Sequence, residues 1–496
     1  MKSIRCAVAA RVSTGLRRSL RCGSGVLSGL LLAMALSACH RNVIFNPIPE
    51  PTVVPGSPDQ VALYFDRYGD LYPNDPKTVG MMSSLKSIPA LCVALHQSKL
   101  DSGDADLNAR LEQYRAVAPA DLVDCYGKSS SAGLVQAWDR VQSRIWSEQL
   151  QSIREKLAKA SEAGGHTQVL LLIHGFNTTQ VEAKDNYDLA IKKLRFLGHD
   201  LSRTLVIQIY WDGLKVKILA PPWAKAQYRA PLVGLSLRRL LNELPTDVTV
   251  LALTHSSGGI VAASMVGDAS GAFPFRNQLP ENCPSQESPY CRYSQANALP
   301  PANRSPAELR IPKPRDVRIG MLAAATPSNS FFYRGCSSLG VQSPNTTLIF
   351  GMNPDDGVVT KGYFGLDQVS LLGATTMATG GEDFDRFREV RDGLQQGRSV
   401  PVTVYGIHFT DAPGHRTYGP LWRGQSHDFG EYLERPAFVD FAKLLLEGDG
   451  CGAVDARGLC AGAPAKAGER HYEPQPPQPT LQPPLPAMAL LVARPA

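Results

Sequence analysis

Residues Leu251–Ile260 read LALTHSSGGI, an apolar run followed by a histidine, two serines and two glycines. The apolar run starts near Asp247 and predicts a buried strand. The sequence IVAASMV, which begins at Ile260, predicts a helix. A sharp turn between a buried strand and a helix is the setting of the G-x-S-x-G elbow, which presents a serine as a nucleophile. The stretch therefore predicts either such an elbow or a plain turn of small residues.

Ser256 is the serine that fits the elbow better. The residues two positions before and after the nucleophile must be small, because the strand and helix backbones approach each other there. For Ser256 these positions hold Thr254 and Gly258. For Ser257 one of them would hold His255, whose ring fits a crowded position badly. Thr254 in place of glycine weakens the match to the motif but does not break it.

A second stretch, Leu170–Thr178, reads LLLIHGFNT and predicts a strand that ends in His-Gly-Phe. A glycine turn in this position lets backbone N–H groups point at a developing oxyanion. The candidate donors are the amides of Phe176 and of Ser257, the residue after the nucleophile. His174 lies at a strand end before the nucleophile, which indicates a structural hydrogen-bonding residue and not the catalytic base.

Short apolar strands alternate with longer helical patterns through the middle of the chain. These strands are almost continuously apolar, as is typical of parallel strands covered on both faces. The alternation predicts an α/β fold with a mostly parallel central sheet. Strands are expected at 168–173, 204–210, 247–253, 317–323, 347–350 and 400–405, and helices at 134–160, 180–197, 225–244 and 258–267. Residues 60–130 support no clear expectation.

The two motifs, in this order, resemble the α/β-hydrolase superfamily. YWDG at Tyr210–Gly213 is similar to the WP- or WD-type turn of a bacterial serine esterase/lipase-like branch. The resemblance covers roughly residues 165–447. It implies the α/β-hydrolase fold, with helices on both faces of the sheet, an N-terminal extension and loop insertions. It also implies a catalytic triad in the chain order serine, acid, histidine.

The acid that the resemblance implies lies in TLIFGMNPDDGVV, at Thr347–Val359. Many members of the superfamily read N-D-G-[VL]-V after this strand, which aligns Asp356 with the acid and Asp355 with the asparagine. The alternative is an Asp-rich turn in which either carboxylate only caps a helix. Asp355 therefore stays an alternative.

The base that the resemblance implies is His427. It lies in GQSHDFGEYLERPAF, ahead of an amphipathic closing helix, and matches the superfamily's histidine with Arg-Pro eight residues later. A histidine on a loop after the last strand can reach both the serine and the acid. His408, which ends a strand, is the alternative, and His415 is expected to be dispensable.

The first 38 residues have the features of an export signal. Residues 1–21 carry six basic side chains and no acidic one, and the apolar segment that follows is too short for a transmembrane helix. Leu36-Ser37-Ala38-Cys39 resembles a bacterial lipobox, in which Cys39 is acylated. An ordinary signal peptide is the alternative. His40 follows in place of aspartate, which by resemblance to the sorting rule indicates the outer membrane, on its periplasmic or surface face.

The charge balance excludes nucleic acid as a partner. The chain has 51 basic and 45 acidic residues, and loss of the six basic signal residues leaves a neutral mature chain. No basic field remains to attract a polyanion. The expected partners are a small-molecule or lipid ester substrate and, through the lipid anchor, the membrane. The sequence does not determine the oligomeric state.

Seven cysteines follow Cys39. An exported chain meets an oxidising compartment, so we expect disulfides between Cys283 and Cys291 and between Cys451 and Cys460, which would close short loops. Free buried thiols are the alternative. No C-x-x-C pair or H-x-x-x-H spacing occurs, so no metal site is expected.

Composition divides the chain into segments. Proline-rich stretches cannot form a packed core and are expected to act as tethers or disordered tails. The expected segments are a signal peptide at 1–38, a tether at 39–60, an N-terminal helical extension at 61–160, the hydrolase domain at 161–450 with an insertion at about 270–314, and a disordered tail at 461–496.

Together these residues predict the hydrolysis of carboxylic esters through an acyl-enzyme, with no cofactor. Ser256 would attack the acyl carbon, His427 would take its proton and Asp356 would orient the imidazole. An acyltransferase or amidase would use the same triad. A non-catalytic envelope lipoprotein that uses the fold to bind a partner is the alternative from another class.

Overall fold

The computed structural model describes the parts of the chain that form the central sheet, its helices and the candidate site. The described residues are 59–66, 69–72, 132–162, 168–213, 220–267, 315–326, 345–353, 356, 391–392, 402–409 and 427–448. Within them, side chains are not described for 132–141, 160–162 and 220–228. All described residues belong to the first of two compact units, Met1–Gly462.

The described strands form one seven-stranded sheet in the order β1-β3-β2-β4-β5-β6-β7. All neighbouring pairs are parallel. This confirms the fold class predicted from the sequence, an α/β fold with a mostly parallel central sheet. The strands are β1 (Gln60–Phe65), β2 (Gln168–Ile173), β3 (Thr204–Trp211), β4 (Thr249–His255), β5 (Val317–Leu322), β6 (Thr346–Met352) and β7 (Thr403–His408).

The central strands bury side chains on both faces of the sheet. In β2, Val169 and Leu171 belong to one hydrophobic cluster, and Leu170 and Leu172 belong to the other. Successive side chains of a strand point to opposite faces. A strand that is covered on both sides therefore needs an unbroken apolar run such as QVLLLI, which is why the sequence displays these strands clearly.

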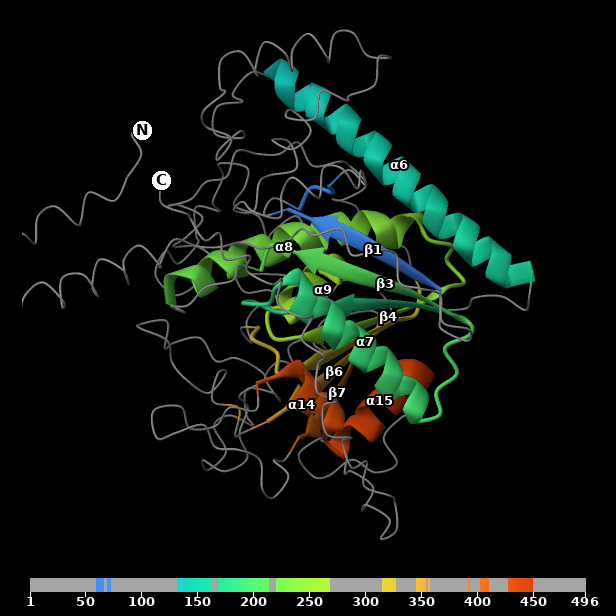
Figure 1. Cartoon of the computed structure of the whole chain (residues 1–496), viewed down its shortest axis with the longest axis vertical. Coiled ribbons are helices and arrows are strands. Elements are labelled where there is room, and N and C mark those ends of the chain that lie inside the picture. Colours follow the sequence, from blue (N-terminus) through green and yellow to red (C-terminus); the bar gives the residue numbers. More distant parts are fainter. Residues whose placement is uncertain are drawn as a thin grey trace, which may run out of the picture. The chain divides into compact units, whose positions relative to one another are not determined.

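Helices cover both faces of the sheet (Figure 1). Residues of α6, α8 and α9 contribute to the first hydrophobic cluster, and residues of α7, α14 and α15 to the second. The four helices expected from the sequence are confirmed, with ends shifted by up to five residues. The helices are α6 (Ala132–Glu162), α7 (Gln180–Phe196), α8 (Ala220–Glu243), α9 (Gly258–Val266), α14 (Phe429–Glu434) and α15 (Ala437–Glu447).

Strand β1 corrects the expectation for the N-terminal region. The helical extension expected at 61–160 would begin inside this strand, yet β1 is an edge strand of the central sheet. It pairs with β3 from Gln60 beside Val206 to Phe65 beside Trp211. The run QVALYF stands well before the strand–helix alternation that begins at residue 168, and its strand state depends on packing against partners that lie far along the chain.

Four strands extend further than the sequence predicted. β3 continues to Trp211, β4 to His255, β6 to Met352 and β7 to His408, past the expected ends at residues 210, 253, 350 and 405. In the parallel register, Thr254 lies beside Ile173 of β2, and His408 lies beside Met352 of β6. Pairing with neighbouring strands thus continues up to the residues that directly precede the candidate site.

Several expectations concern residues outside the described parts. These are the lipobox at Cys39, the tether, the insertion at 270–314, the tail, and the two disulfides Cys283–Cys291 and Cys451–Cys460. They stay predictions. None of the helices in the described ranges is both long enough and apolar enough to cross a membrane.

Candidate active site

Ser256 lies at the turn between β4 and α9, with a backbone φ of 53°. This left-handed region is unfavourable for a residue with a Cβ and persists only where the surroundings hold it. Two hydrogen bonds do so here. The Ser256 amide donates to the carbonyl of Leu322 at 2.9 Å, and the Ser256 carbonyl accepts from the amide of Gly259 at 3.1 Å. The turn therefore has the strained geometry of a nucleophile elbow.

Two glycines allow neighbouring backbones to lie against this elbow. A Cβ at Gly175 would be 2.7 Å from the Cβ of Ser256. A Cβ at Gly258 would be 2.6 Å from the carbonyl oxygen of Ile173. Both distances are too short for real side chains. The H-G-F and S-S-G-G sequences are thus two halves of one closely packed cluster of turns.

Thr254 occupies the elbow position where the motif has a glycine. Its side chain is completely buried in β4. Its hydroxyl has no hydrogen-bond partner within the described part of the chain. A buried hydroxyl without a partner costs free energy, so the elbow accommodates the branched side chain but gains nothing from its oxygen.

We therefore expect Thr254→Val to leave the fold unchanged and to raise the free energy of unfolding by about 1 kcal/mol. The substitution keeps the branched shape and removes the unpaired hydroxyl. Thr204→Val is the matched control, because the Thr204 hydroxyl donates to Gln168 at 3.4 Å and its loss should destabilise the chain. Denaturant unfolding of the two variants checks this, and a Thr254→Val chain less stable than the wild type would contradict it.

Ser256, His427 and Asp356 form one chain of hydrogen bonds. The Nε2 atom of His427 is 3.0 Å from Oγ of Ser256, and its Nδ1 atom is 2.8 Å from Oδ2 of Asp356. The Asp356 side chain is completely buried, whereas 18% of the His427 side chain is exposed. A carboxylate only accepts hydrogen bonds, so it holds the proton on Nδ1 and leaves Nε2 as the acceptor for the serine hydroxyl.

His427 is positioned by the start of helix α14. The next residue, Asp428, is the N-cap, and its carboxylate accepts from the amide of Gly430 at 2.8 Å. An N-cap of this kind satisfies one of the unpaired amides of the first turn. The side chains of Phe429 and Leu433, both within α14, are buried. The helix start is thus fixed to the core, and the histidine with it.

Asp356 lies in a turn after β6, where several groups hold it. Its amide donates to the carbonyl of Asn353 at 3.2 Å. Its Oδ2 atom accepts from the hydroxyl of Tyr432 at 2.8 Å, in addition to the contact with His427. Burial, and then the charge of Asp356, raise the pKa of Tyr432 well above its ordinary value. The phenol is therefore the donor, a role that the sequence analysis did not find.

His255 packs against the candidate base from the strand side. Its ring centroid lies 4.8 Å from that of His427 and 5.5 Å from that of Phe429. Burial, together with the neighbouring His427, lowers the pKa of His255 to about 3. A hydrogen bond to the His427 backbone acts in the opposite direction, as donation to a carbonyl would. His255 is thus a neutral ring that packs against the imidazole, a role that its sequence context did not indicate.

His174 connects the His-Gly-Phe turn to β3. Its Nδ1 atom is 2.8 Å from the carbonyl of Gly175, and its Nε2 atom accepts from the amide of Trp211 at 3.1 Å. These contacts define a neutral ring with its proton on Nδ1. Burial lowers the pKa of His174 to about 4, which agrees with that state. The structural role that the sequence indicated for His174 is confirmed.

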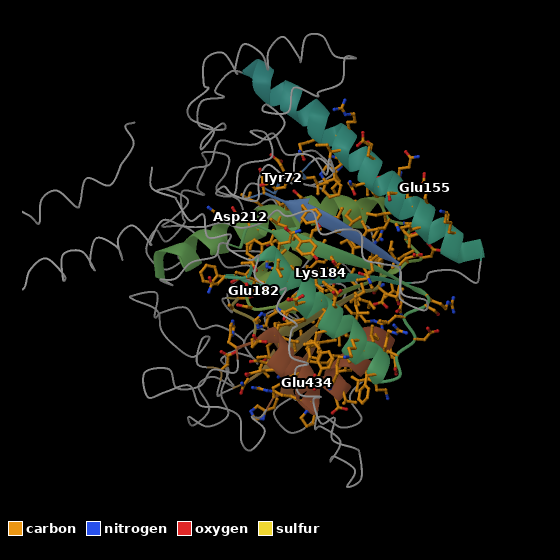
Figure 2. The ribbon with its side chains drawn as sticks, viewed as in Figure 1. Tyr72, Glu155, Glu182, Lys184, Asp212 and Glu434 are labelled. Atoms are coloured by element: carbon orange, nitrogen blue, oxygen red, sulfur yellow. The ribbon has the colours of Figure 1, made fainter. Side chains whose placement is uncertain are left out.

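The amide of Phe176, a candidate oxyanion donor, belongs to the loop that packs on the elbow. The following residue, Asn177, has a φ of 62°, and its amide donates to the carbonyl of Gly213 at 3.1 Å. In the same W-D-G turn, buried Asp212 forms an ion pair with Arg229 at 2.9 Å. Figure 2 shows Asp212 at the end of the sheet where the strands finish. The turn after β3 therefore holds the loop that contains Phe176 and Asn177 in place.

Arg238 fixes the far end of α9, the helix that follows Ser256 and Ser257. Its side chain is almost completely buried, and its guanidinium donates to the carbonyls of Ser264 at 2.7 Å and Met265 at 3.1 Å. A cation at this position satisfies the last carbonyls and opposes the negative end of the helix dipole. The charge lies on α8, so only the packing of the two helices reveals its role.

The remaining candidates from the sequence are placed as follows. His408 ends β7 beside Met352, whereas His427 is the histidine bonded to Ser256. Asp355 and His415 lie outside the described residues. Within the described ranges, no group of three or more histidine, cysteine or acidic side chains could hold a metal ion.

Comparison with known proteins assigns no family. No family model matches the chain, and no curated protein matches it. Among solved structures, an acetyl ester-xyloside bifunctional hydrolase from Caldicellulosiruptor lactoaceticus is similar over 50% of this chain and 75% of that one. The sequence identity is 12% and the TM-score is 0.24. At this distance the likeness carries no information about activity.

Proposed function

We propose that the chain is a serine hydrolase that cleaves carboxylic esters with Ser256, His427 and Asp356 as its triad. The observation that carries the proposal is the hydrogen-bond chain from the serine through the histidine to a buried carboxylate, at 3.0 and 2.8 Å. The site lies where parallel strands end, which is the ligand-binding edge of α/β sheets. The left-handed φ of the serine adds strain that a plain turn does not need.

The proposed reaction has two halves. In the first, Oγ of Ser256 attacks the acyl carbon while its proton moves to Nε2 of His427. The amides of Phe176 and Ser257 hold the resulting oxyanion. The intermediate then collapses, the ester C–O bond breaks, and His427 gives its proton to the leaving alcohol. In the second half water repeats these steps on the acyl-enzyme and releases the acid, while Asp356 stabilises the imidazolium without taking its proton.

An acyltransferase or an amidase would use the same triad. Esters are proposed because an alkoxide leaves more readily than an amide anion, so the reaction demands least of the site. Purified mature chain should be assayed against esters of graded acyl length, the matched amides, and the esters with an added alcohol acceptor. Faster turnover of the amides, or predominant transfer to the alcohol, would reject hydrolysis of esters as the main activity.

Labelling by a fluorophosphonate tests the proposal directly. Such a reagent reacts with a serine only where a base activates it and an oxyanion site stabilises the adduct. We expect stoichiometric labelling, with peptide mapping that places the adduct on Ser256. Ser257→Ala is the control and should still be labelled, because only its backbone amide is used. A properly folded chain that is not labelled would instead support a non-catalytic binding protein.

We propose that an acylated Cys39 holds the mature chain at the cell envelope, in the outer membrane. The lipobox-like Leu36–Cys39 and the basic residues before it support this. A diacylated cysteine supplies the two hydrophobic chains that stable anchoring needs. Cys39→Ala should release the chain from membranes or block its processing, as fractionation would show. Unmodified Cys39 in membrane-bound mature protein would overturn the proposal.

A further inference from the structure

Tyr432 makes a contact that the proposed reaction does not use. Its hydroxyl donates to Oδ2 of Asp356 at 2.8 Å, and the same oxygen accepts from Nδ1 of His427 at 2.8 Å. Two donors therefore converge on one carboxylate oxygen, and neither bond is long. The Tyr432 side chain is completely buried. It is not part of the surface that a substrate would meet, so any effect on the reaction acts through Asp356.

The same short segment delivers both donors to the acid. His427 precedes α14 and Tyr432 lies within it, and Asp428 caps the helix between them. The guanidinium of Arg435 lies 4.7 Å from the centre of the Tyr432 ring. Because α14 fixes the spacing of the two donors, the position of one constrains the position of the other. The α14 segment thus positions both side chains that bond to Asp356, the candidate base His427 and Tyr432.

We infer that Tyr432 is a positioning residue that orients the Asp356 carboxylate and draws part of its negative charge away from His427. The inference rests on the proposed function. A hydrogen bond to a charged carboxylate is among the stronger ones in proteins. With two donors on Oδ2, the carboxylate attracts the imidazolium proton less strongly, so His427 returns that proton to the leaving group more readily.

The charged and titratable groups around His427 come from three elements. Among the described residues, Asp356 follows β6, His255 ends β4, Asp428 is the N-cap of α14 directly after His427, and Tyr432 with Arg435 lies on or just after α14. Asp356 and Asp428 are the anions of this set. The Asp428 carboxylate accepts from the amide of Gly430, whereas the Asp356 carboxylate is the one bonded to Tyr432. His255 is neutral at any pH where an esterase would be assayed, since its pKa is lowered to about 3 chiefly by burial. A change in the pH dependence after substitution of Tyr432 therefore reports on the carboxylate.

The test is Tyr432→Phe, which removes the hydroxyl and keeps the ring. We expect kcat to fall about tenfold with KM unchanged. The acidic limb of the kcat/KM profile should move to higher pH by about half to one unit. The direction follows because an undivided carboxylate charge stabilises the imidazolium, and the neutral base then forms only at higher pH. Tyr210→Phe is the matched control, since its buried hydroxyl donates to Gln208 at 2.7 Å, away from the triad.

Two further variants separate positioning from simple packing. In an Asp356→Asn background, Tyr432→Phe should cost less than about twofold, because residues that act through one contact are not additive. Replacing Tyr432 alone with 3-fluorotyrosine keeps its size and strengthens the donor, so the acidic limb should move to lower pH. This variant also keeps the inference testable if Tyr432→Phe does not fold. An unmoved acidic limb, or a full tenfold loss in the Asp356→Asn background, would overturn the inference.

A spectroscopic measurement distinguishes failure of this inference from failure of the proposed function. The Nδ1 proton of a histidine bonded to a carboxylate resonates far downfield in proton NMR. That resonance should move in Tyr432→Phe and stay in place in Tyr210→Phe, whether or not the chain hydrolyses any ester. A wild-type chain that is neither labelled nor active refutes the proposed function. A His427 resonance that does not respond to Tyr432→Phe refutes the role of Tyr432.

Discussion

Ser256→Ala should lower ester hydrolysis by about a millionfold and abolish fluorophosphonate labelling, because the nucleophile and its base act as a unit. The methyl group of alanine fits the space of the Ser256 Cβ against Gly175, so the fold should be retained. Single-turnover kinetics and circular dichroism on the same preparation measure both effects. Residual hydrolysis above water would come from the oxyanion donors and substrate binding alone.

Ser256→Gly and Ser257→Ala are the informative controls for this result. Glycine adopts a φ of 53° without strain, so Ser256→Gly should be inactive yet more stable than Ser256→Ala by about 1 kcal/mol. Ser257→Ala should keep most of its turnover. If Ser257→Ala were the inactive variant and Ser256→Ala the active one, the nucleophile would be one residue further along the chain.

His427→Ala should reduce turnover about as far as Ser256→Ala, roughly a millionfold, because His427 is the proposed acceptor of the serine proton and the two residues act as a unit. The histidine bridges the serine at 3.0 Å and the acid at 2.8 Å, so its loss breaks both contacts together. The combined Ser256→Ala/His427→Ala chain should be no slower than either single variant. Pre-steady-state assays with an activated ester, in which a burst reports the acyl-enzyme, would show the loss of acylation.

The other titratable candidates provide the comparison for His427. Asp356→Asn should be less severe, because the acid orients and stabilises the imidazolium but does not take its proton. Asp355→Asn, His408→Ala and His415→Ala should fold and keep most of their turnover. An inactive His408→Ala beside an active His427→Ala would move the base to the end of β7. An inactive Asp355→Asn beside an active Asp356→Asn would move the acid by one residue.

The sequence predicted those parts of the fold in which the type of each residue follows directly from its burial. QVLLLI at 168–173 is apolar at consecutive positions because both faces of β2 are covered, and the parallel sheet follows from such runs. β1, which reads QVALYF, is a similar apolar run that the sequence did not place in the sheet. Its place at the sheet edge depends on pairing with β3, about 140 residues away, which no local pattern expresses.

The candidate site divides in the same way. The turn chemistry around Ser256, the glycines of both loops and the chain order of serine, acid and histidine were legible because backbone geometry restricts the residues at those positions. Tyr432, His255 and Arg238 were not found. Each acts through a contact between elements, namely α14 with the turn after β6, β4 with the residue before α14, and α8 with α9.

By itself, then, the sequence determined the α/β class, the position of the elbow and a short set of candidates for acid and base. Only the tertiary structure decided that His427 and not His408 meets Ser256, and that a buried tyrosine shares the acid with it. The physical reason is the separation along the chain between the residues that interact. Strand, helix and turn preferences are set by neighbours along the chain, whereas a hydrogen bond 2.8 Å long between residues 71 or 76 positions apart depends on how every intervening element packs.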